Sequence, residues 1–183
     1  MPNARNMART IKQKGLPFDF QKQDGGSATD VFSLIEQMDK QLTEEQRYSV
    51  MQEQGCCKSD DITAPFRAFG HAHAGKPLAE KIALMDELKT GHKAPCHLNP
   101  DGTLAIYWGS GGEGDNQCVC RSIKRMPEKK PVSLTFCGCC AGHVRNTYQH
   151  ALGVGLQLKK IVSSAVASDG REQCSFLFDV VEA

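Results

Sequence analysis

The sequence lacks the features that mark several large classes of protein. Its longest apolar run, residues 154–166, is interrupted by Lys159 and Lys160, whereas a membrane-spanning helix needs about 20 apolar residues in succession. Lys and Arg are scattered along a chain of net charge +1, so no basic stripe indicates nucleic-acid binding. The basic residues 1–14 are not followed by the apolar block of a signal peptide. We therefore expect a cytoplasmic protein that binds neither membranes nor nucleic acid.

Internal repeats and dividing linkers are also missing from the sequence. A chain of 183 residues is long enough to bury a core without disulfides, and a reducing compartment would keep its thiols free or metal-bound. The glycine-rich residues 109–114 lack the Gly-Lys-Ser/Thr of a phosphate-binding loop, so we interpret them as a mobile loop. We expect residues 1–24 to form a flexible polar tail and residues 25–183 to form a single domain.

The order of the sequence patterns predicts the class of fold. Helical periodicity and capping signals occupy the first half of the chain, whereas alternating patterns and turn signals dominate the second half. The predicted helices cover residues 29–38, 43–55, 62–73, 76–91 and 139–152, and the predicted strands cover residues 96–98, 103–108, 117–123, 131–136, 156–165 and 174–181. This order predicts an α+β domain in which N-terminal helices pack on a C-terminal antiparallel sheet.

The sequence is rich in cysteine. Nine cysteines are present, and three of them lie with a histidine in Phe136-Cys-Gly-Cys-Cys-Ala-Gly-His143. Cys118 and Cys120 form a C-x-C motif, and Cys56 and Cys57 are adjacent. A buried structural cysteine behaves as a small apolar side chain and gains nothing from clustering. Dense thiols beside an imidazole therefore indicate metal binding, redox chemistry or nucleophilic catalysis.

Metal binding is the first interpretation of this cluster. A strand would direct the thiols of Cys118 and Cys120 to the same side, and a helix beginning near Cys139 would place its thiols beside His143. Four such soft ligands suit tetrahedral zinc, with iron as a second candidate. The candidate ligands are Cys118, Cys120, Cys137, Cys139, Cys140 and His143, with Cys56 and Cys57 as weaker candidates.

The same residues are compatible with other functions. In a thiol-dependent hydrolase of a small cyclic or amide-like molecule, Cys139 or Cys140 would attack and His143 would move the proton. A non-enzymatic sensor would instead bind a small apolar ligand between helices and sheet. A redox dithiol protein is a fourth hypothesis, although the βαβ context of thioredoxin-like motifs is missing. Whether the protein is an enzyme stays open, and so does its oligomeric state, with a homodimer as one option.

Five further cysteine and histidine residues are weaker candidates. Cys96 stands beside His97, and Cys174 is expected to face the core from its strand. In a helix, the imidazoles of His71 and His73 would point apart, which disfavours a shared metal ion.

The C-terminal third resembles known families. The motif at residues 136–143, a helix that ends at Gly153, a strand with Ser163-Ser164, and Cys174-Ser-Phe176 follow one another in order. This series is similar to uncharacterised bacterial and archaeal proteins related to 4-vinyl reductase type small-molecule-binding domains, and to the L-2-amino-thiazoline-4-carboxylic acid hydrolase family. The resemblance implies an α+β fold around a small-molecule pocket, metal held by cysteines in some members, and site positions at the thiols of residues 118–140 and at His143.

Overall fold

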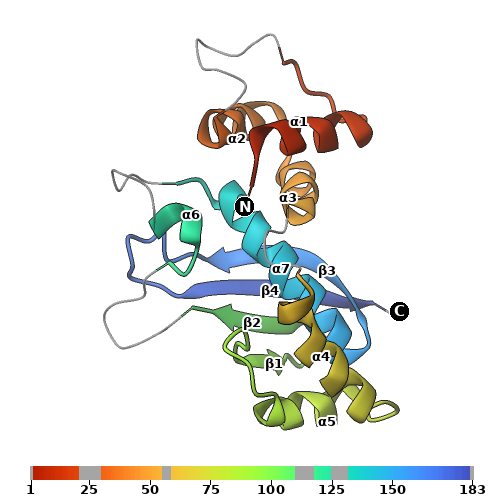
Figure 1. The fold of residues 1–183 in the computed structure, drawn as a ribbon. Helices are drawn as coiled ribbons and strands as arrows, with labels where there is room; N and C mark the ends of the chain where they lie inside the picture. The colour runs from red at the N-terminus through yellow and green to blue at the C-terminus, as the bar shows by residue number, and fades with distance from the viewer. Residues whose placement is uncertain (1, 21–29, 55–58, 110–117, 125–131, 182–183) are drawn as a thin grey trace.

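A computed structural model describes residues 2–20, 30–54, 59–109, 118–124 and 132–181. Its elements, in chain order, are α1 (Ala4–Gln13), α2 (Val31–Gln41), α3 (Glu44–Glu53), α4 (Asp60–Ala72), α5 (Leu78–Ala83), the 3₁₀-helix η1 (Leu84–Glu87), β1 (Cys96–Leu98), β2 (Leu104–Trp108), α6 (Arg121–Lys124), α7 (Leu134–Leu152), β3 (Gly155–Ser163) and β4 (Cys174–Val181). Most helices precede the sheet, so the α+β prediction is confirmed (Figure 1).

The four strands form one antiparallel sheet in the order β1-β2-β4-β3. Alternate residues of β2 and β4, including Ile106, Phe176 and Phe178, are buried in the core, as the period of two in a strand requires. Strand β3 departs from strict alternation because its pairing with β4 shifts after Leu158 and again after Ile161. These irregularities allow both residues to pack against the same core.

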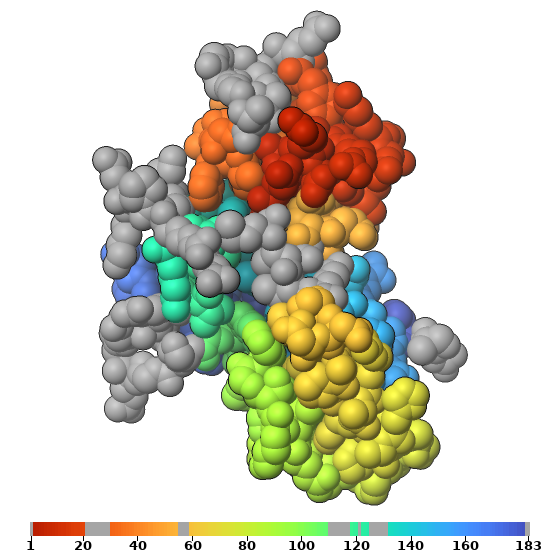
Figure 2. Space-filling view, in the orientation of Figure 1, coloured from red at the N-terminus to blue at the C-terminus, as the bar shows by residue number. Residues whose placement is uncertain are grey.

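Helix α7 is the central element of the molecule (Figure 1). Its residues belong to two apolar clusters. The first cluster lies between α7, α4 and the sheet and includes Phe66, Tyr148 and Phe176. The second lies between α7 and helices α1, α2 and α3 and includes Met38 and Phe136. Figure 2 shows α1 and α2 at one end of the molecule and α4 and α5 at the other.

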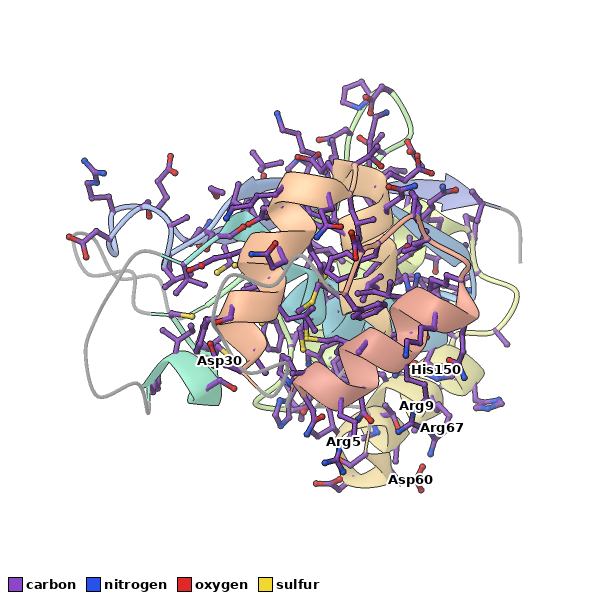
Figure 3. All side chains as sticks on the ribbon, turned by 90° about the horizontal axis from the view of Figure 1, so that it is seen from above. Arg5, Arg9, Asp30, Asp60, Arg67 and His150 are labelled. Carbon is purple, nitrogen blue, oxygen red and sulfur yellow. The ribbon has the colours of Figure 1, made fainter. Side chains whose placement is uncertain are left out.

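The prediction of a flexible N-terminal tail is wrong for its first half. Residues Ala4–Gln13 form helix α1, and the Asn3 side chain accepts a hydrogen bond from the backbone N–H of Asn6 as the N-cap. Met7 and Ile11 are fully buried in the second cluster. Arg5 and Arg9 lie on the exposed side of the helix (Figure 3). Residues 21–24 lie outside the described residues.

Two predicted strands are also wrong. Cys118 to Cys120 have no regular structure and are followed by the short helix α6. The predicted strand at residues 131–136 is replaced by the first turn of α7, where Ser133 is the N-cap and accepts a hydrogen bond from the backbone N–H of Thr135. A serine cap fixes the helix start here against the strand preference of Val132 and Thr135.

Other local predictions are confirmed. Thr43 and Gln46 form a capping box at the start of α3. Gly153 ends α7 in the left-handed conformation with φ 67°. The helix expected at residues 76–91 is shorter, because α5 ends at Ala83 and continues only as η1.

Candidate functional site

The cysteines of the Phe136–His143 motif lie within α7 and not at its first residues. The helix begins at Leu134, so Cys137 is its fourth residue and Cys140 its seventh. The stabilisation of a thiolate by a helix N-terminus is confined to the first turn. The prediction that this helix begins near Cys139 is therefore wrong, and the start of the helix does not activate the thiols of Cys139 and Cys140.

Cys140 contacts Cys120, which precedes α6. The two side chains are hydrogen-bonded, with the thiol of Cys140 donating to the sulfur of Cys120. This donated bond lowers the pKa of Cys120 to about 6. The same bond, together with burial, raises the pKa of Cys140 well above its ordinary value. Within this pair, Cys120 is the thiolate and Cys140 the thiol.

Cys137 faces the sheet from the same helix. Its sulfur lies 3.1 Å from the hydroxyl oxygen of Ser164. The pKa of the Cys137 thiol is raised to about 12, mainly by burial and in smaller part by the neighbouring Cys174, Cys118 and Cys120, against a lowering by the hydrogen bond with Ser164. Burial also raises the pKa of Cys118 to about 11. Thiols from α7, from β4 and from residues 118–120 therefore share one region of low polarity.

Cys139 packs in the opposite direction. It belongs to the second apolar cluster, and its sulfur donates a long hydrogen bond of 3.8 Å to the carbonyl oxygen of Gln54. Gln54 is the C-cap of α3. Cys56 and Cys57, which follow Gln54 in the sequence, lie outside the described residues, as does the glycine-rich segment at residues 110–117.

His143 lies one turn beyond Cys140 on α7 and is buried. Its ring centroid is 5.0 Å from that of Trp108 and 6.1 Å from that of His92, both in edge-on arrangements. Trp108 is the direct partner of Cys174 across strands β2 and β4. The imidazole is thus placed beside an indole and a second imidazole at the end of the sheet where Cys174 lies.

The predicted site residues therefore divide into two groups. The first group contains Cys118, Cys120, Cys137 and Cys140, whose thiols neighbour one another. Cys139 also neighbours Cys140, but its own sulfur is hydrogen-bonded to the carbonyl oxygen of Gln54. In the parts of the chain that the structure describes, no group of three or more His, Cys, Asp or Glu side chains is arranged to hold a metal ion. Figure 3 shows sulfur atoms among the helices in the interior of the molecule.

Two residues of this region were not predicted as site residues. Cys174 is buried in the core, as expected, but it also neighbours Cys118 and Cys137. Ser164 is buried and contacts both Cys137 and Cys174. The signal in the sequence was the turn at residues 168–171, because an antiparallel hairpin around it brings Ser164 close to Cys174.

The remaining candidates lie elsewhere. Cys96 is on β1, where burial raises its pKa to about 11 and Asp86 and Lys93 are its charged neighbours. His71 is exposed, whereas His73 lies 3.3 Å from Glu87 and packs on Phe69. This difference agrees with the expectation that the two imidazoles point apart.

The chain matches no protein-family model, no curated protein and no solved structure. The resemblance to 4-vinyl reductase type domains and to the thiazoline hydrolase family therefore stays an expectation that rests on the quoted motifs. Among the described helices, none combines the length and the apolar character needed to span a bilayer.

Proposed function

We propose that the protein binds a zinc ion through Cys118, Cys120, Cys137 and Cys140. The observation that carries this proposal is the hydrogen bond between Cys120 and Cys140, which joins two elements whose other thiols, Cys118 and Cys137, lie nearby. Four sulfur ligands and no open position are typical of structural zinc sites. Iron is the second candidate, because the same donors suit it.

Metal binding at this place is coupled to the loss of protons from the thiols. The pKa of Cys140 is raised most by its hydrogen bond to Cys120. In addition, the pKa values of Cys118, Cys137 and Cys140 are raised because burial disfavours their thiolates and because neighbouring sulfurs would repel them. A bound divalent cation reverses both effects, since a coordinating thiol is deprotonated outright. Binding therefore releases protons and weakens as the pH falls.

The expected role of the metal is to fasten residues 118–124 to α7. Cys118 and Cys120 lie outside regular structure, and no three donors are yet placed around a common point in the described part of the chain. Binding therefore has to draw the four side chains together, and its free energy adds to the stability of the folded state. A reducing, cytoplasmic location, which keeps these thiols available to metal, belongs to the same proposal.

The alternative of a thiol-dependent hydrolase gains less support from the geometry. A cysteine nucleophile needs a lowered pKa, but the pKa of Cys140 is raised and Cys139 packs among apolar residues. The ring contacts of His143 described above are with Trp108 and His92. The hydrolase and the apolar-ligand sensor both stay predictions from the sequence.

The deciding experiment is elemental analysis of tag-free, full-length protein, followed by cobalt substitution. The expected result is about one zinc per chain and thiolate-to-cobalt charge-transfer absorption in the substituted protein. Cys120→Ser and Cys140→Ser should each lose most of the metal.

Two serine variants serve as controls. Cys96→Ser removes a half-buried thiol outside the proposed site and should keep the metal. Cys174→Ser removes a buried thiol next to the site and should also keep it, at some loss of stability. Protein without metal after purification in zinc-containing buffer, or equal metal content in all variants, would contradict the proposal.

A further inference from the structure

We propose that Cys120 and Cys140 react with a hydroperoxide to form a reversible disulfide. This inference goes beyond metal binding, because the reaction uses only the two thiols and the oxidant. It starts from the hydrogen bond between the two side chains, which are 20 residues apart in the sequence and lie on separate elements. Hydrogen-bonded sulfurs need little movement to reach bonding distance.

Burial separates this pair from three of the other thiols in the described part of the chain. Cys120 and Cys140 are partly exposed, whereas Cys137, Cys139 and Cys174 are buried. The Cys120 side chain packs against the second apolar cluster and the Cys140 side chain against the first. The pair therefore lies where the two clusters meet, and neither residue is fully buried. Oxidation of thiols follows exposure as well as thiolate character.

The hydrogen bond also assigns the order of the steps. The Cys120 sulfur, which accepts the bond, attacks one oxygen of the peroxide. The O–O bond breaks, and the departing hydroxide takes a proton to become water, which leaves Cys120 as a sulfenic acid. The Cys140 sulfur then attacks the Cys120 sulfur, so that the S–S bond forms as the S–O bond breaks. The proton of the Cys140 thiol leaves with the hydroxide as a second water.

The reaction consumes one molecule of hydrogen peroxide for each disulfide that forms. Two thiols lose two electrons and two protons, and hydrogen peroxide is reduced to two waters. A dithiol reductant reverses the reaction by thiol–disulfide exchange.

Competing disulfides are disfavoured by the same geometry. Cys137 is buried and its sulfur contacts Ser164. Cys118 is partly exposed, but it is separated from Cys120 by one residue only, and a bridge between two such close positions departs from ordinary disulfide geometry. Cys140 is therefore the partner that resolves the oxidised Cys120.

The disulfide would tie residues 118–124 covalently to α7. If the zinc site of the preceding section exists, which is the one point that rests on the proposed function, the disulfide consumes two of its four ligands. Oxidation by peroxide would then release the ion, and a reductant would restore binding.

The test uses the full chain, purified under reducing conditions and treated with one equivalent of hydrogen peroxide. Free thiols are then alkylated, and the protein is digested with trypsin without reduction. The tryptic peptide that ends at Arg121 contains Cys96, Cys118 and Cys120, whereas the one that ends at Arg145 contains Cys137, Cys139 and Cys140. The expected product is a cross-linked pair of these two peptides that dithiothreitol separates.

Single variants assign the linkage within the two peptides. Cys140→Ser should abolish the cross-link and leave a sulfenic acid on Cys120 that dimedone labels. Cys120→Ser should abolish both the cross-link and the labelling. Cys118→Ser, Cys137→Ser and Cys96→Ser should keep the cross-link.

Three results would overturn the inference: a different linkage, a cross-link that survives in Cys120→Ser, or no cross-link while other thiols are oxidised. The linkage in the wild-type chain decides the matter even where a variant fails to fold. Metal content, measured on the same samples, separates the two proposals. A cross-link in metal-free protein refutes only the zinc site, and bound zinc without a cross-link refutes only the disulfide.

Discussion

The α-carbon of Gly142 lies directly against the backbone of Gln52. A Cβ atom at position 142 would be 2.4 Å from the Gln52 carbonyl oxygen, and one at position 138 would be 2.7 Å from the Cβ of Met51. Helices α3 and α7 are therefore in backbone contact. The two glycines of the Phe136–His143 motif have a packing role, and the cysteines between them are held in place by it.

Replacing Gly142 with alanine should destabilise the protein. The added methyl group meets backbone atoms, which cannot move aside as a flexible side chain can, so we expect a loss of about 3 kcal/mol, at the upper end of the usual overpacking range. Urea denaturation measures the free energy of unfolding. Gly91→Ala is the matched control, because nothing lies within 4 Å of a Cβ at that position. An equal effect of the two substitutions would contradict the packing role.

The buried Lys81 provides a second test of how α7 is held. Its Nζ donates a 2.7 Å hydrogen bond to the carbonyl oxygen of Leu152, the last residue of α7. Lys81→Met keeps most of the apolar stem but leaves this carbonyl without its donor, so we expect a loss of about 1–3 kcal/mol. Lys76→Met removes an exposed ion pair with Glu80 and should change stability by less than about 1 kcal/mol. Thermal denaturation measures the loss of stability in both variants. A larger loss in Lys76→Met than in Lys81→Met would contradict a stabilising role for the hydrogen bond from Lys81 to Leu152.

Helix α1 gives a third prediction. Ile11 is fully buried against the second cluster, so Ile11→Ala should lower the free energy of unfolding by about 2–5 kcal/mol. Arg5→Ala, on the exposed side of the same helix (Figure 3), should change it by less than about 0.5 kcal/mol. Chemical denaturation distinguishes the two cases. If Ile11→Ala were as stable as the wild type, the segment would behave as the flexible tail that its composition suggests.

Helix α1 was predicted as a tail because its composition hides its helical pattern. Ala4, Met7 and Ile11 have the spacing of one helix face, but the basic residues between them hide the pattern when only composition is considered. Strong local signals, such as the capping box at Thr43, predicted the structure correctly. At residues 132–136 the residue preferences favoured a strand, whereas the cap at Ser133 and packing on α3 and the sheet select a helix.

For the site, the sequence identified the donor residues but not their grouping. Adjacent residues on a helix point about 100° apart, so only one of Cys139 and Cys140 can face residues 118–120. Which one does so depends on how α7 is rotated against α3, and the glycine contacts at positions 138 and 142 set that rotation. The nearness of Cys174 depends on strand pairing, which no spacing within the motif reveals.

The pH dependence of alkylation tests the assignment of Cys120 as the thiolate. Only the thiolate reacts with iodoacetamide, and the bond donated by Cys140 lowers the pKa of Cys120 to about 6. In reduced, metal-free protein, labelling of Cys120 should therefore stay near its maximum from pH 8 down to about pH 7 and fall by half near pH 6. Mass spectrometry after timed labelling, with fragmentation of the peptides, follows each thiol separately, because Cys96, Cys118 and Cys120 share one tryptic peptide.

The control thiol has the opposite shift. Burial raises the pKa of Cys96 to about 11, so its labelling should be slow at neutral pH and increase through the alkaline range. Cys140→Ala removes the donor and should move the midpoint for Cys120 upward towards the ordinary thiol value of about 8.5, which slows its labelling at pH 7. A wild-type midpoint already at that value would mean that the thiol of Cys140 does not stabilise a thiolate at Cys120. The donor and acceptor roles would be reversed only if the midpoint for Cys140 were the lower of the two, because the partner with the lower pKa is the one that accepts the hydrogen bond.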